Sequence, residues 1–308
     1  MPHTRFAHLH VHTEYSILDG LITVKDLIAK AVQYKLPALA ITDHGNMFGA
    51  LEFYTQARSA GIKPIIGIET YVAPKGRADH ALSETDDTSY HLLLLARNEK
   101  GYKNLLVLSS LAYLEGFYRK PRIDKELLSQ HAEGLIALSA CTKGEIPQAL
   151  LKGDKEKARK AAAFYKDLFG PDFYLEIQDH GMEDEKVINP GLLELSQEME
   201  IGLVATNDVH YLESKDAKVH DVLLCIQTGA TLDDEKRLKF SNQSFYFRSP
   251  EEMVKLFGHL PGAIENTVAI AERCNLTLDQ LTCGKMHLPH FKVPAEYPSQ
   301  NAYLKHLA

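Results

Sequence analysis

Residues 8–16 read HLHVHTEYS, and His8, His10 and His12 recur at every second position of this stretch. Successive side chains of a β-strand point to opposite faces, so the three imidazoles share one face if the stretch is extended. Two interpretations stay open here. The face is either a solvated strand surface with coincidental histidines, or it carries metal ligands, because neutral imidazole is a common ligand of zinc and related cations.

The composition is that of a large globular chain. Its 308 residues suggest one large domain or two ordinary ones, and 45% apolar residues suffice for a sizeable core. The sequence contains neither a run of about 20 apolar residues nor an apolar signal core, so we expect a cytoplasmic protein without membrane contact. The net charge of −7 argues against a wide basic surface for duplex DNA, although bound metal ions can supply positive charge locally. Cys141, Cys225, Cys274 and Cys283 are too far apart for a disulfide framework.

Short apolar runs alternate with amphipathic segments over the first two thirds of the chain. Such alternation is typical of parallel βαβ units, and strands this apolar are usually covered on both faces. Seven strands approach the eight of a (β/α)8 barrel, so the sequence predicts an α/β barrel. The strand-like runs are 5–11, 37–42, 63–73, 90–96, 134–140, 172–178 and 202–206. The helix-like segments are 23–34, 100–114, 154–169 and 185–200.

The chain changes character beyond about residue 212, where the strand-like runs stop. A helix is expected at 249–257, because Ser249 is a good N-cap and a proline follows it at the first helical position. A second amphipathic helix is expected at 261–276. The C-terminal stretch is rich in proline and then enters a further helix.

Side chains with metal-ligand chemistry accompany every predicted strand, and in an α/β barrel the chemistry gathers at the carboxyl ends of the strands. Each residue alone has a structural explanation, since a lone cysteine, for example, is usually a small buried hydrophobe. Buried together without cations, the carboxylates would carry a large cost of unpaired charge, so their coincidence favours a metal centre. The candidates are His10, His12, Asp43, His44, Glu69, His91, Cys141, Asp179, His180, Asp208 and His210.

The same stretches resemble the motifs of a known family. HLHVHTEYS, ITDHGN, GIE, the isolated His91, SAC and NDVH are similar to those of the PHP (polymerase and histidinol phosphatase) family. The longer segments HTEYSILDGL, ALAITDHGNMFGALEFY, VATNDVHYL, TLDDEKR and SPEEMVKLF resemble the PHP domains of the DNA polymerase III alpha-subunit family. The resemblance covers essentially the whole chain. It implies the PHP fold, a distorted (βα)7 TIM-like barrel, followed by a short helical extension.

The resemblance also implies that this chain is the N-terminal part of a longer DNA-directed DNA polymerase. In that family the PHP domain precedes the palm, thumb and fingers, so these domains and other subunits of the replication holoenzyme are the expected partners. The polymerase active site is not expected here, because no Asp-x-Asp palm motif follows a Gly-Ser stretch. The expected parts are the barrel core at 1–212, a helical remainder at 213–285, and a linker with the start of the polymerase core at 286–308.

A trinuclear centre of divalent cations is a further implication of the resemblance. The mixture of His, carboxylate and one thiolate favours Zn²⁺, with Mn²⁺ or Fe²⁺ tolerated. Asp19 enters the set only through the resemblance. His8 stands where many family members have Asp, and we leave it outside the set. The nine family ligands fall on His10, His12, Asp19, His44, Glu69, His91, Cys141, Asp208 and His210.

Clustered divalent cations suit phosphoester hydrolysis, because they activate water and hold the attacking and leaving oxygens in line. We expect Glu69 to bridge two cations and to act with His12, Asp208 and His210 as the catalytic core. The substrate contacts are less specific. His180 either faces the scissile phosphate or packs, and Arg119 and Arg122 either contact a DNA strand or lie in a solvated loop.

Three functions remain open. The first is a 3′–5′ exonuclease that proofreads the DNA 3′ end for the attached polymerase. The second is a small-molecule phosphatase of the histidinol-phosphate kind, and the polymerase-like segments after residue 212 count against it. The third is a non-catalytic module that metals stabilise, and the complete ligand set counts against that function.

Overall fold

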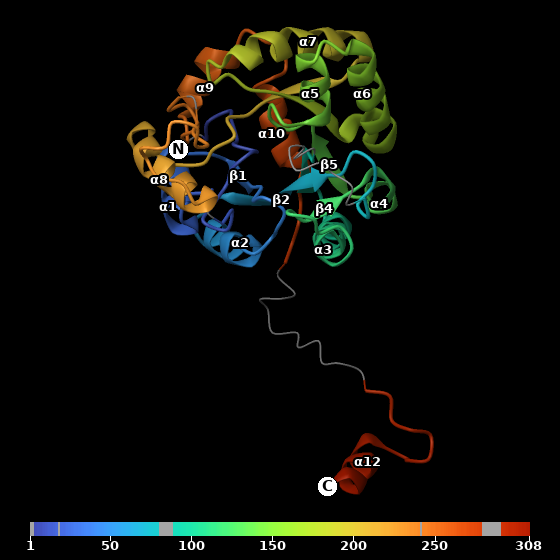
Figure 1. Cartoon of the computed structure of the whole chain (residues 1–308). Helices are drawn as coiled ribbons and strands as arrows, with labels where there is room; N and C mark the ends of the chain where they lie inside the picture. Colours follow the sequence, from blue (N-terminus) through green and yellow to red (C-terminus); the bar gives the residue numbers. More distant parts are fainter. Residues whose placement is uncertain (1–2, 18, 80–88, 241, 279–290) are drawn as a thin grey trace. The chain divides into compact units, whose positions relative to one another are not determined.

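The computed structural model describes residues 3–17, 19–79, 89–240, 242–278 and 291–308 (Figure 1). The chain divides into two compact units, Met1–Leu276 and Thr277–Ala308. The expected boundary at 212 therefore lies inside the first unit, and the one at 285 lies outside the described residues. In the second unit, helix α12 (Gln300–Leu307) begins after Ser299, whose hydroxyl accepts a hydrogen bond from the Ala302 amide at 3.2 Å.

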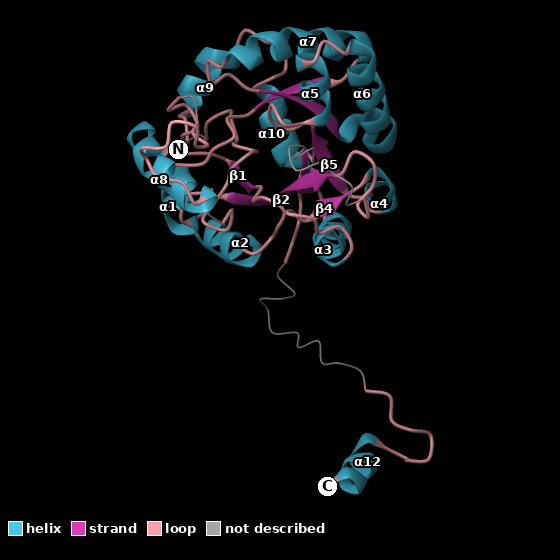
Figure 2. Cartoon of the chain, viewed as in Figure 1, coloured by secondary structure: helices cyan, strands magenta, loops and turns pink. Residues whose placement is uncertain are grey.

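The first unit is built on one seven-stranded sheet with the order β1-β2-β3-β5-β6-β7, in which β4 pairs with β2 (Figure 2). Six of the seven predicted strands are confirmed, and β4 falls in a stretch where no strand was predicted. The strands are β1 (Ala38–Ile41), β2 (Lys63–Val72), β3 (Tyr90–Ala96), β4 (Arg122–Ile123), β5 (Leu135–Leu138), β6 (Phe173–Ile177) and β7 (Gly202–Ala205).

The predicted first strand, 5–11, is extended but is not a regular strand. It makes single parallel bridges, from His8 to Leu39 in β1 and from Val11 to Val209 beyond β7. The N-terminal segment thus connects the first strand of the sheet path with the chain beyond its last strand, and so curls the sheet into a distorted barrel. The alternation of side chains that the sequence suggested is kept, because an extended segment has the same period as a strand.

The sheet is mixed, and the prediction of an all-parallel barrel is wrong at β3. This strand runs antiparallel to both β2 and β5, whereas β1–β2, β2–β4, β5–β6 and β6–β7 are parallel. Parallel neighbours need a crossover, usually a helix, but antiparallel neighbours do not. Of the connection between β2 and β3, the described residues 73–79 and 89 contain no helix.

Helices flank the sheet (Figure 1). The predicted helices are confirmed as α1 (Val24–Gln33), α3 (Glu99–Leu114), α6 (Lys155–Phe169), α7 (Glu183–Met199), α9 (Pro250–Phe257) and α10 (Glu265–Arg273). Not expected from the sequence were α2 (Ala50–Ser59), α4 (Lys125–Gln130), α5 (Glu145–Leu151), α8 (Ala217–Thr228) and the short 3-10 turns η1 (Gly170–Asp172) and η2 (Ser214–Asp216). No helix among the described residues is long and apolar enough to cross a membrane.

Caps explain why the confirmed helices begin where the sequence placed them. Ser249 accepts a hydrogen bond from the amide of Glu252 at 3.2 Å, and the Ser249 amide donates to the Glu252 carboxylate at 2.7 Å. This capping box satisfies two amides that a helix start leaves without partners. At α1, Thr23 accepts from the amide of Asp26 at 3.1 Å in the same manner.

The core lies inside the barrel and extends to α10. This helix packs against β1 and β7, and Ile270 and Ala271 belong to the same buried cluster as Leu9, Leu93 and Val204. Helix α10 follows residue 212, but it completes the barrel rather than forming a separate part. Burial of these side chains stabilises the folded state by about 25 cal/mol per Å² of apolar surface removed from water. The packed core thereby holds in place the strands that carry the site.

Candidate metal centre

Four of the nine predicted ligands lie where the carboxyl ends of parallel strands meet. His44 follows β1, Cys141 follows β5, and Asp208 and His210 follow β7. His91 differs from these four because it lies at the start of its strand. Strand β3 is antiparallel to β2, so its beginning lies at the end where its neighbours finish. The reversed direction of β3 therefore explains why its ligand comes first.

The loops that carry two ligands have unusual backbone conformations. Asp208 has a φ of 42° and Ala140, which precedes Cys141, has a φ of 64°. Residues other than glycine adopt this left-handed region infrequently. Each such residue costs about 1–3 kcal/mol and persists only where its surroundings hold it. Both conformations coincide with ligand-bearing loops, which indicates that the fold holds these side chains in fixed directions.

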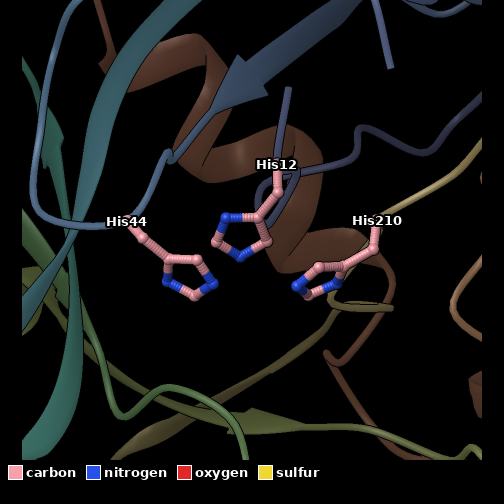
Figure 3. A group of neighbouring side chains, drawn as sticks. All are labelled: His12, His44 and His210. Carbon is pink, nitrogen blue, oxygen red and sulfur yellow. The ribbon is translucent and has the colours of Figure 1, made fainter. Parts of the chain in front are cut away.

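The ligand atoms gather into overlapping groups. The three groups are His10–His12–Asp208, His12–His44–His210 and His44–Glu69–His91, and within each group the ligand atoms lie within 4.8 Å of one another. Figure 3 shows the rings of His12, His44 and His210 around a common space. Because His12 and His44 each belong to two groups, the groups adjoin as the ligand shells of neighbouring cations do.

The spacing in the first group suits a small cation. The Nε2 atom of His10 lies 3.1 Å from Nε2 of His12 and 3.0 Å from Oδ1 of Asp208, and the latter two atoms are 3.2 Å apart. A tetrahedral Zn²⁺ with bonds of about 2.0–2.1 Å places its ligands about 3.3 Å from one another. The three atoms are therefore as far apart as ligands of one cation.

Several of these atoms lie close together without forming hydrogen bonds. Nδ1 of His44 and Oε2 of Glu69 are 2.6 Å apart, yet neither has a hydrogen-bond partner. Oδ1 of Asp19 and Oδ1 of Asp208 are likewise buried without a hydrogen bond. A buried polar atom without a partner is costly, and lone pairs that converge are what a cation needs. The residues present therefore fit a cluster of divalent cations.

Hydrogen bonds to the protein fix the tautomer of His12. The hydroxyl of Ser16 donates to Asp43 at 2.9 Å, so it accepts from Nδ1–H of His12 at 3.0 Å. Burial and the neighbouring imidazoles of His44 and His210 lower the pKa of His12 to about 3. His12 is thus neutral and presents the lone pair of Nε2 to the cluster, which is the form that binds a metal ion.

A similar contact fixes His210. Its Nδ1 lies 2.8 Å from the backbone carbonyl oxygen of Asp208, and because a carbonyl only accepts, Nδ1 carries the proton. Nε2 remains available to the cluster. Burial, helped by the neighbouring imidazoles of His44 and His220, lowers the pKa of His210 although the carboxylates of Asp208 and Asp19 act to raise it, which favours the neutral ring.

Glu69 lies at the middle of the centre and is completely buried. Oε1 lies 2.9 Å from Nδ1 of His91 and 3.4 Å from Nε2 of His10, while Oε2 faces His44 and, at 3.7 Å, Nε2 of His12. Burial raises the pKa of Glu69, but the imidazoles of His91, His44 and His10 together hold that pKa well below its usual range. A carboxylate whose two oxygens face different histidine groups is placed to bridge two cations.

The electrostatics of the remaining ligands agree with a site that needs positive charge. Burial acts to raise the pKa values of Asp19 and Asp208, but nearby imidazoles hold both well below the usual range. Burial, followed by the charges of Asp208 and Glu69, raises the pKa of the Cys141 thiol well above its ordinary value. The Cys141 sulfur lies 3.7 Å from Nδ1 of His91. Cations would compensate the three carboxylates and favour the thiolate.

The centre opens into a cleft of about 1020 Å³. Asp19, His44, His91, Cys141, Asp208 and His210 line it, so six of the nine predicted ligands are accessible from one side. His10, His12 and Glu69 are fully buried beneath them. Taken with the three ligand groups, the structure brings all nine predicted side chains to one place.

His180 does not face the cleft, and its prediction as a substrate contact is corrected. Nδ1 pairs with the carboxylate of Glu185 at 2.7 Å, and Nε2 pairs with the backbone carbonyl oxygen of Asn207 at 3.0 Å. The ring also stacks on Phe245 with centroids 4.0 Å apart. Both nitrogens are therefore committed within the protein, and His180 is a packed histidine.

Arg122 is also corrected. The side chain is buried, and its guanidinium donates to the backbone carbonyl oxygens of Gly116, Arg77 and Asp79 at 3.0, 2.9 and 3.1 Å. It tethers loops and cannot reach a substrate. Arg119 is exposed and precedes a cleft residue in the chain, so its contact with DNA stays a prediction.

His8 lies outside the cluster, as we expected when we left it out of the ligand set. Its Nε2 lies 2.8 Å from the backbone carbonyl oxygen of Arg248, and the ring stacks on Phe247. Burial lowers its pKa to about 4.

Asp43 and Asp179 were the further strand-end candidates. Asp43 supports Ser16 and thereby His12, whereas Asp179 accepts a hydrogen bond from an amide in its own exposed turn.

Sequence reasoning missed the side chains that hold the ligands. Ser16 fixes His12 and follows it by four residues. Glu176 contacts His10 from within β6, although the search at the end of that strand led to Asp179 and His180. The available signal was a charged residue inside an otherwise apolar strand, since such a residue is buried only with a partner.

The comparisons with known proteins agree with this geometry. A model described as "PHP domain" matches residues 8–180. The chain is 48% identical over 304 residues to DNA polymerase III subunit alpha of Borreliella burgdorferi, which covers 99% of this chain and 26% of that protein. It is 49% identical over 308 residues to the protein of the same name from Treponema pallidum, which covers 100% of this chain and 26% of that protein. The chain spans about a quarter of the length of these curated relatives.

Among solved structures, a predicted metal-dependent phosphoesterase from Bifidobacterium adolescentis aligns with 83% of this chain and 97% of its own, with 14% identity and a TM-score of 0.45. The resemblance that the sequence motifs suggested is confirmed by the family model and by the curated relatives. The matched region spans more than half of the chain and contains the ligand positions from His10 to Cys141. The chain belongs to the PHP domain family.

Proposed function

We propose that this chain is the PHP domain of a replicative DNA polymerase, and that it is a metal-dependent phosphoesterase that removes nucleotides from the 3′ end of DNA as a proofreading exonuclease. The observation that carries the proposal is the convergence of nine ligand-type side chains on one open cleft, several with buried atoms that lack hydrogen bonds. Three divalent cations, Zn²⁺ first, with Mn²⁺ or Fe²⁺ as alternatives, would supply an activated water and stabilise charge on the phosphate.

The chain's own residues have distinct roles in this proposal. Glu69 would bridge two cation sites, and His12 and Asp208 would complete the group that includes His10. His210 lies beside Asp208 with its Nε2 available and belongs to the neighbouring group. We propose these four side chains, Glu69, His12, Asp208 and His210, as the catalytic core, because each belongs to a group of ligand atoms beside or beneath the cleft.

The size of the cleft and the lysines on its wall favour a DNA strand over a small monoester. Its volume of about 1020 Å³ is at the upper end of ordinary ligand pockets, which are about 300–1,000 Å³. Lys120, Lys143 and Lys239 line it, and lysines are common partners of backbone phosphates. Phe240 lines it too, beside the ring of His210 at a centroid distance of 5.2 Å, where it offers a face for a base.

The wider setting is part of the same proposal. Relatives that share 48–49% identity with this chain and are about four times as long are named DNA polymerase III subunit alpha. We propose that palm, thumb and fingers domains belong to the same polymerase, that other replication holoenzyme subunits bind it, and that it works in the cytoplasm. The proposed parts of the chain are the barrel with its closing helices and a linker toward those domains.

One observation favours a second function, a structural module that metals stabilise. The N-terminal segment that closes the barrel is held to its neighbours by isolated bridges, and it carries His10 and His12. Cations shared with Glu69 and Asp208 would tie this segment to β2 and to the chain beyond β7. Such a role needs the same ligands but no substrate, so an activity measurement separates the two functions.

The test measures release of 3′ nucleotides from single-stranded DNA and from a 3′-mismatched primer, with Zn²⁺ or Mn²⁺ supplied. A small phosphate monoester is the comparison substrate. We expect hydrolysis of both DNA substrates and little of the monoester. If folded protein releases no nucleotide with either metal, the nuclease proposal is wrong and the structural function remains. If the protein hydrolyses only the monoester, it is a phosphatase instead.

Lys143→Ala tests whether a lysine of the cleft contacts a DNA phosphate. The variant should weaken binding of DNA and reduce the dependence of binding on salt by about one unit of slope, as expected for one phosphate contact. Hydrolysis of a monoester should change less. Lys160→Ala, on the exposed surface of α6 and outside the cleft, is the matched control and should leave both quantities unchanged.

A further inference from the structure

Glu176 is a buried acid that the proposed reaction does not use directly. It lies within β6 and is 1% exposed. An ionised carboxylate in such a place is costly unless charged or hydrogen-bonding groups surround it. An apolar side chain at this position would be buried without that cost. The contacts of Glu176 must therefore explain why a carboxylate is found there.

One oxygen of Glu176 collects three donors. Oε1 lies 2.6 Å from Nδ1 of His10 and accepts from the amide of Gln178 at 2.8 Å and from the hydroxyl of Thr206. Gln178 also donates to the Thr206 hydroxyl at 3.0 Å. The carboxylate is therefore held from β6 itself and from the end of β7, and its position relative to His10 is fixed by both strands.

This arrangement fixes the proton on His10. A carboxylate oxygen that takes protons from Thr206 and Gln178 can only accept from His10 as well, so Nδ1 of His10 carries a proton. Nε2 of His10 then faces the cluster, 3.0 Å from Oδ1 of Asp208. A carboxylate behind a metal-binding imidazole orients the ring and makes its other nitrogen more basic.

We propose that Glu176 is a positioning residue of the metal centre: it holds His10 in the Nδ1–H form and so strengthens cation binding at the group that His10 shares with His12 and Asp208. The inference rests on the proposed function only in that the cluster binds cations. Gln178 and Thr206 support it by holding Glu176. Loss of a partner of this kind typically lowers metal affinity about 10- to 100-fold.

The chain contains a matched control for this proposal. Glu185 is also a buried carboxylate, and it pairs with Nδ1 of His180 at 2.7 Å, much as Glu176 pairs with His10. Nε2 of His180 pairs with a backbone carbonyl oxygen and does not belong to the cluster. A change of Glu185 therefore disturbs a similar Glu–His pair, together with the cap of α7, without touching a proposed ligand.

The experiment compares Zn²⁺ affinity, measured by competition with a coloured chelator, in the wild-type chain, Glu176→Gln and Glu185→Gln. Glutamine keeps the shape of glutamate and removes its charge. We expect Glu176→Gln to bind one Zn²⁺ per chain, the one assigned to the group of His10, about 10- to 100-fold less tightly, while Glu185→Gln stays within about twofold of wild type at every site. The absorption spectrum of bound Co²⁺ should change in Glu176→Gln alone, since only there is the ligand His10 disturbed.

Wild-type affinity in folded Glu176→Gln would overturn the proposal, and so would an equal loss in Glu185→Gln, which would mean that the effect acts through the fold. If Glu176→Gln does not fold, Thr206→Val is the second test, because it removes the hydroxyl that donates to Glu176 and keeps the shape of the side chain. This variant should weaken Zn²⁺ binding severalfold. Unchanged binding would overturn the proposal. A wild-type chain that binds no Zn²⁺ would refute the proposed metal centre itself, which is a distinct outcome because it needs no variant.

Discussion

Asp208→Asn and His12→Ala should each lower the rate of 3′-nucleotide release by about 10²–10³-fold or more. Removing one positioned group that stabilises charge in a transition state commonly has an effect of this size. Asp208 supplies an oxygen 3.0 Å from Nε2 of His10, and His12 belongs to two of the three ligand groups. Loss of either disturbs a cation and the water that it would activate.

The control for these variants is His8→Gln. His8 lies outside the cluster and contacts the backbone carbonyl oxygen of Arg248, to which glutamine can still donate. Its rate of nucleotide release should remain within a few-fold of wild type. Equal rates in wild type and Asp208→Asn, with both proteins folded, would mean that the nuclease activity comes from another site or from a contaminant.

Removal of the cations should destabilise the fold. A ligand whose free concentration is about 100 times its dissociation constant stabilises the native state by about 2.7 kcal/mol. In domains of about 150–250 residues, each kcal/mol shifts the melting temperature by about 2–4 °C. A strong chelator should therefore lower the melting temperature by about 5 °C or more, because the cluster joins the N-terminal segment to β2 and to the chain beyond β7.

The control for the chelator is the same compound saturated with Zn²⁺ beforehand, which should leave the melting temperature unchanged. Unfolding would be followed by circular dichroism on protein whose metal content is measured before and after treatment. A melting curve that stays the same after verified loss of metal would contradict a stabilising role for the cluster.

The sequence predicted the barrel well where the apolar runs were long and had clear ends. Six strands and six helices lie where periodicity and caps placed them, because burial and capping are local properties that sequence spacing records. The direction of β3 was not predictable in this way. An apolar run has the same pattern in parallel and antiparallel strands, and direction depends on how the chain returns from β2.

The ligand set was largely visible in the sequence because strand ends in a barrel converge. Asp19 was an exception. It lies in a turn rather than at a strand end, and its side chain reaches His44 at 3.1 Å only through the fold of that turn. Residues that support the ligands were missed for a related reason. Glu176 and His10 are 166 positions apart, and no local pattern connects them.

Two of the three predicted substrate contacts, His180 and Arg122, were wrong because the sequence offered only residue type. Arg119 and Arg122 were candidates for a DNA contact by their charge, but the fold buries Arg122 against backbone carbonyls. Lys120 from the same stretch does line the cleft. Which of several neighbouring basic side chains faces a substrate depends on the path of the loop, and composition alone does not record that path.

The central claim is that the cluster is a centre for divalent cations, and elemental analysis of the purified chain tests it most directly. Protein prepared without chelator, or stripped and reconstituted with Zn²⁺ or Mn²⁺, should contain two to three divalent ions per chain, as expected for three overlapping groups of candidate ligands. The double variant His12→Ala/Asp208→Asn should contain fewer. Folded wild-type protein that carries no divalent ion and takes up none on reconstitution would contradict the account.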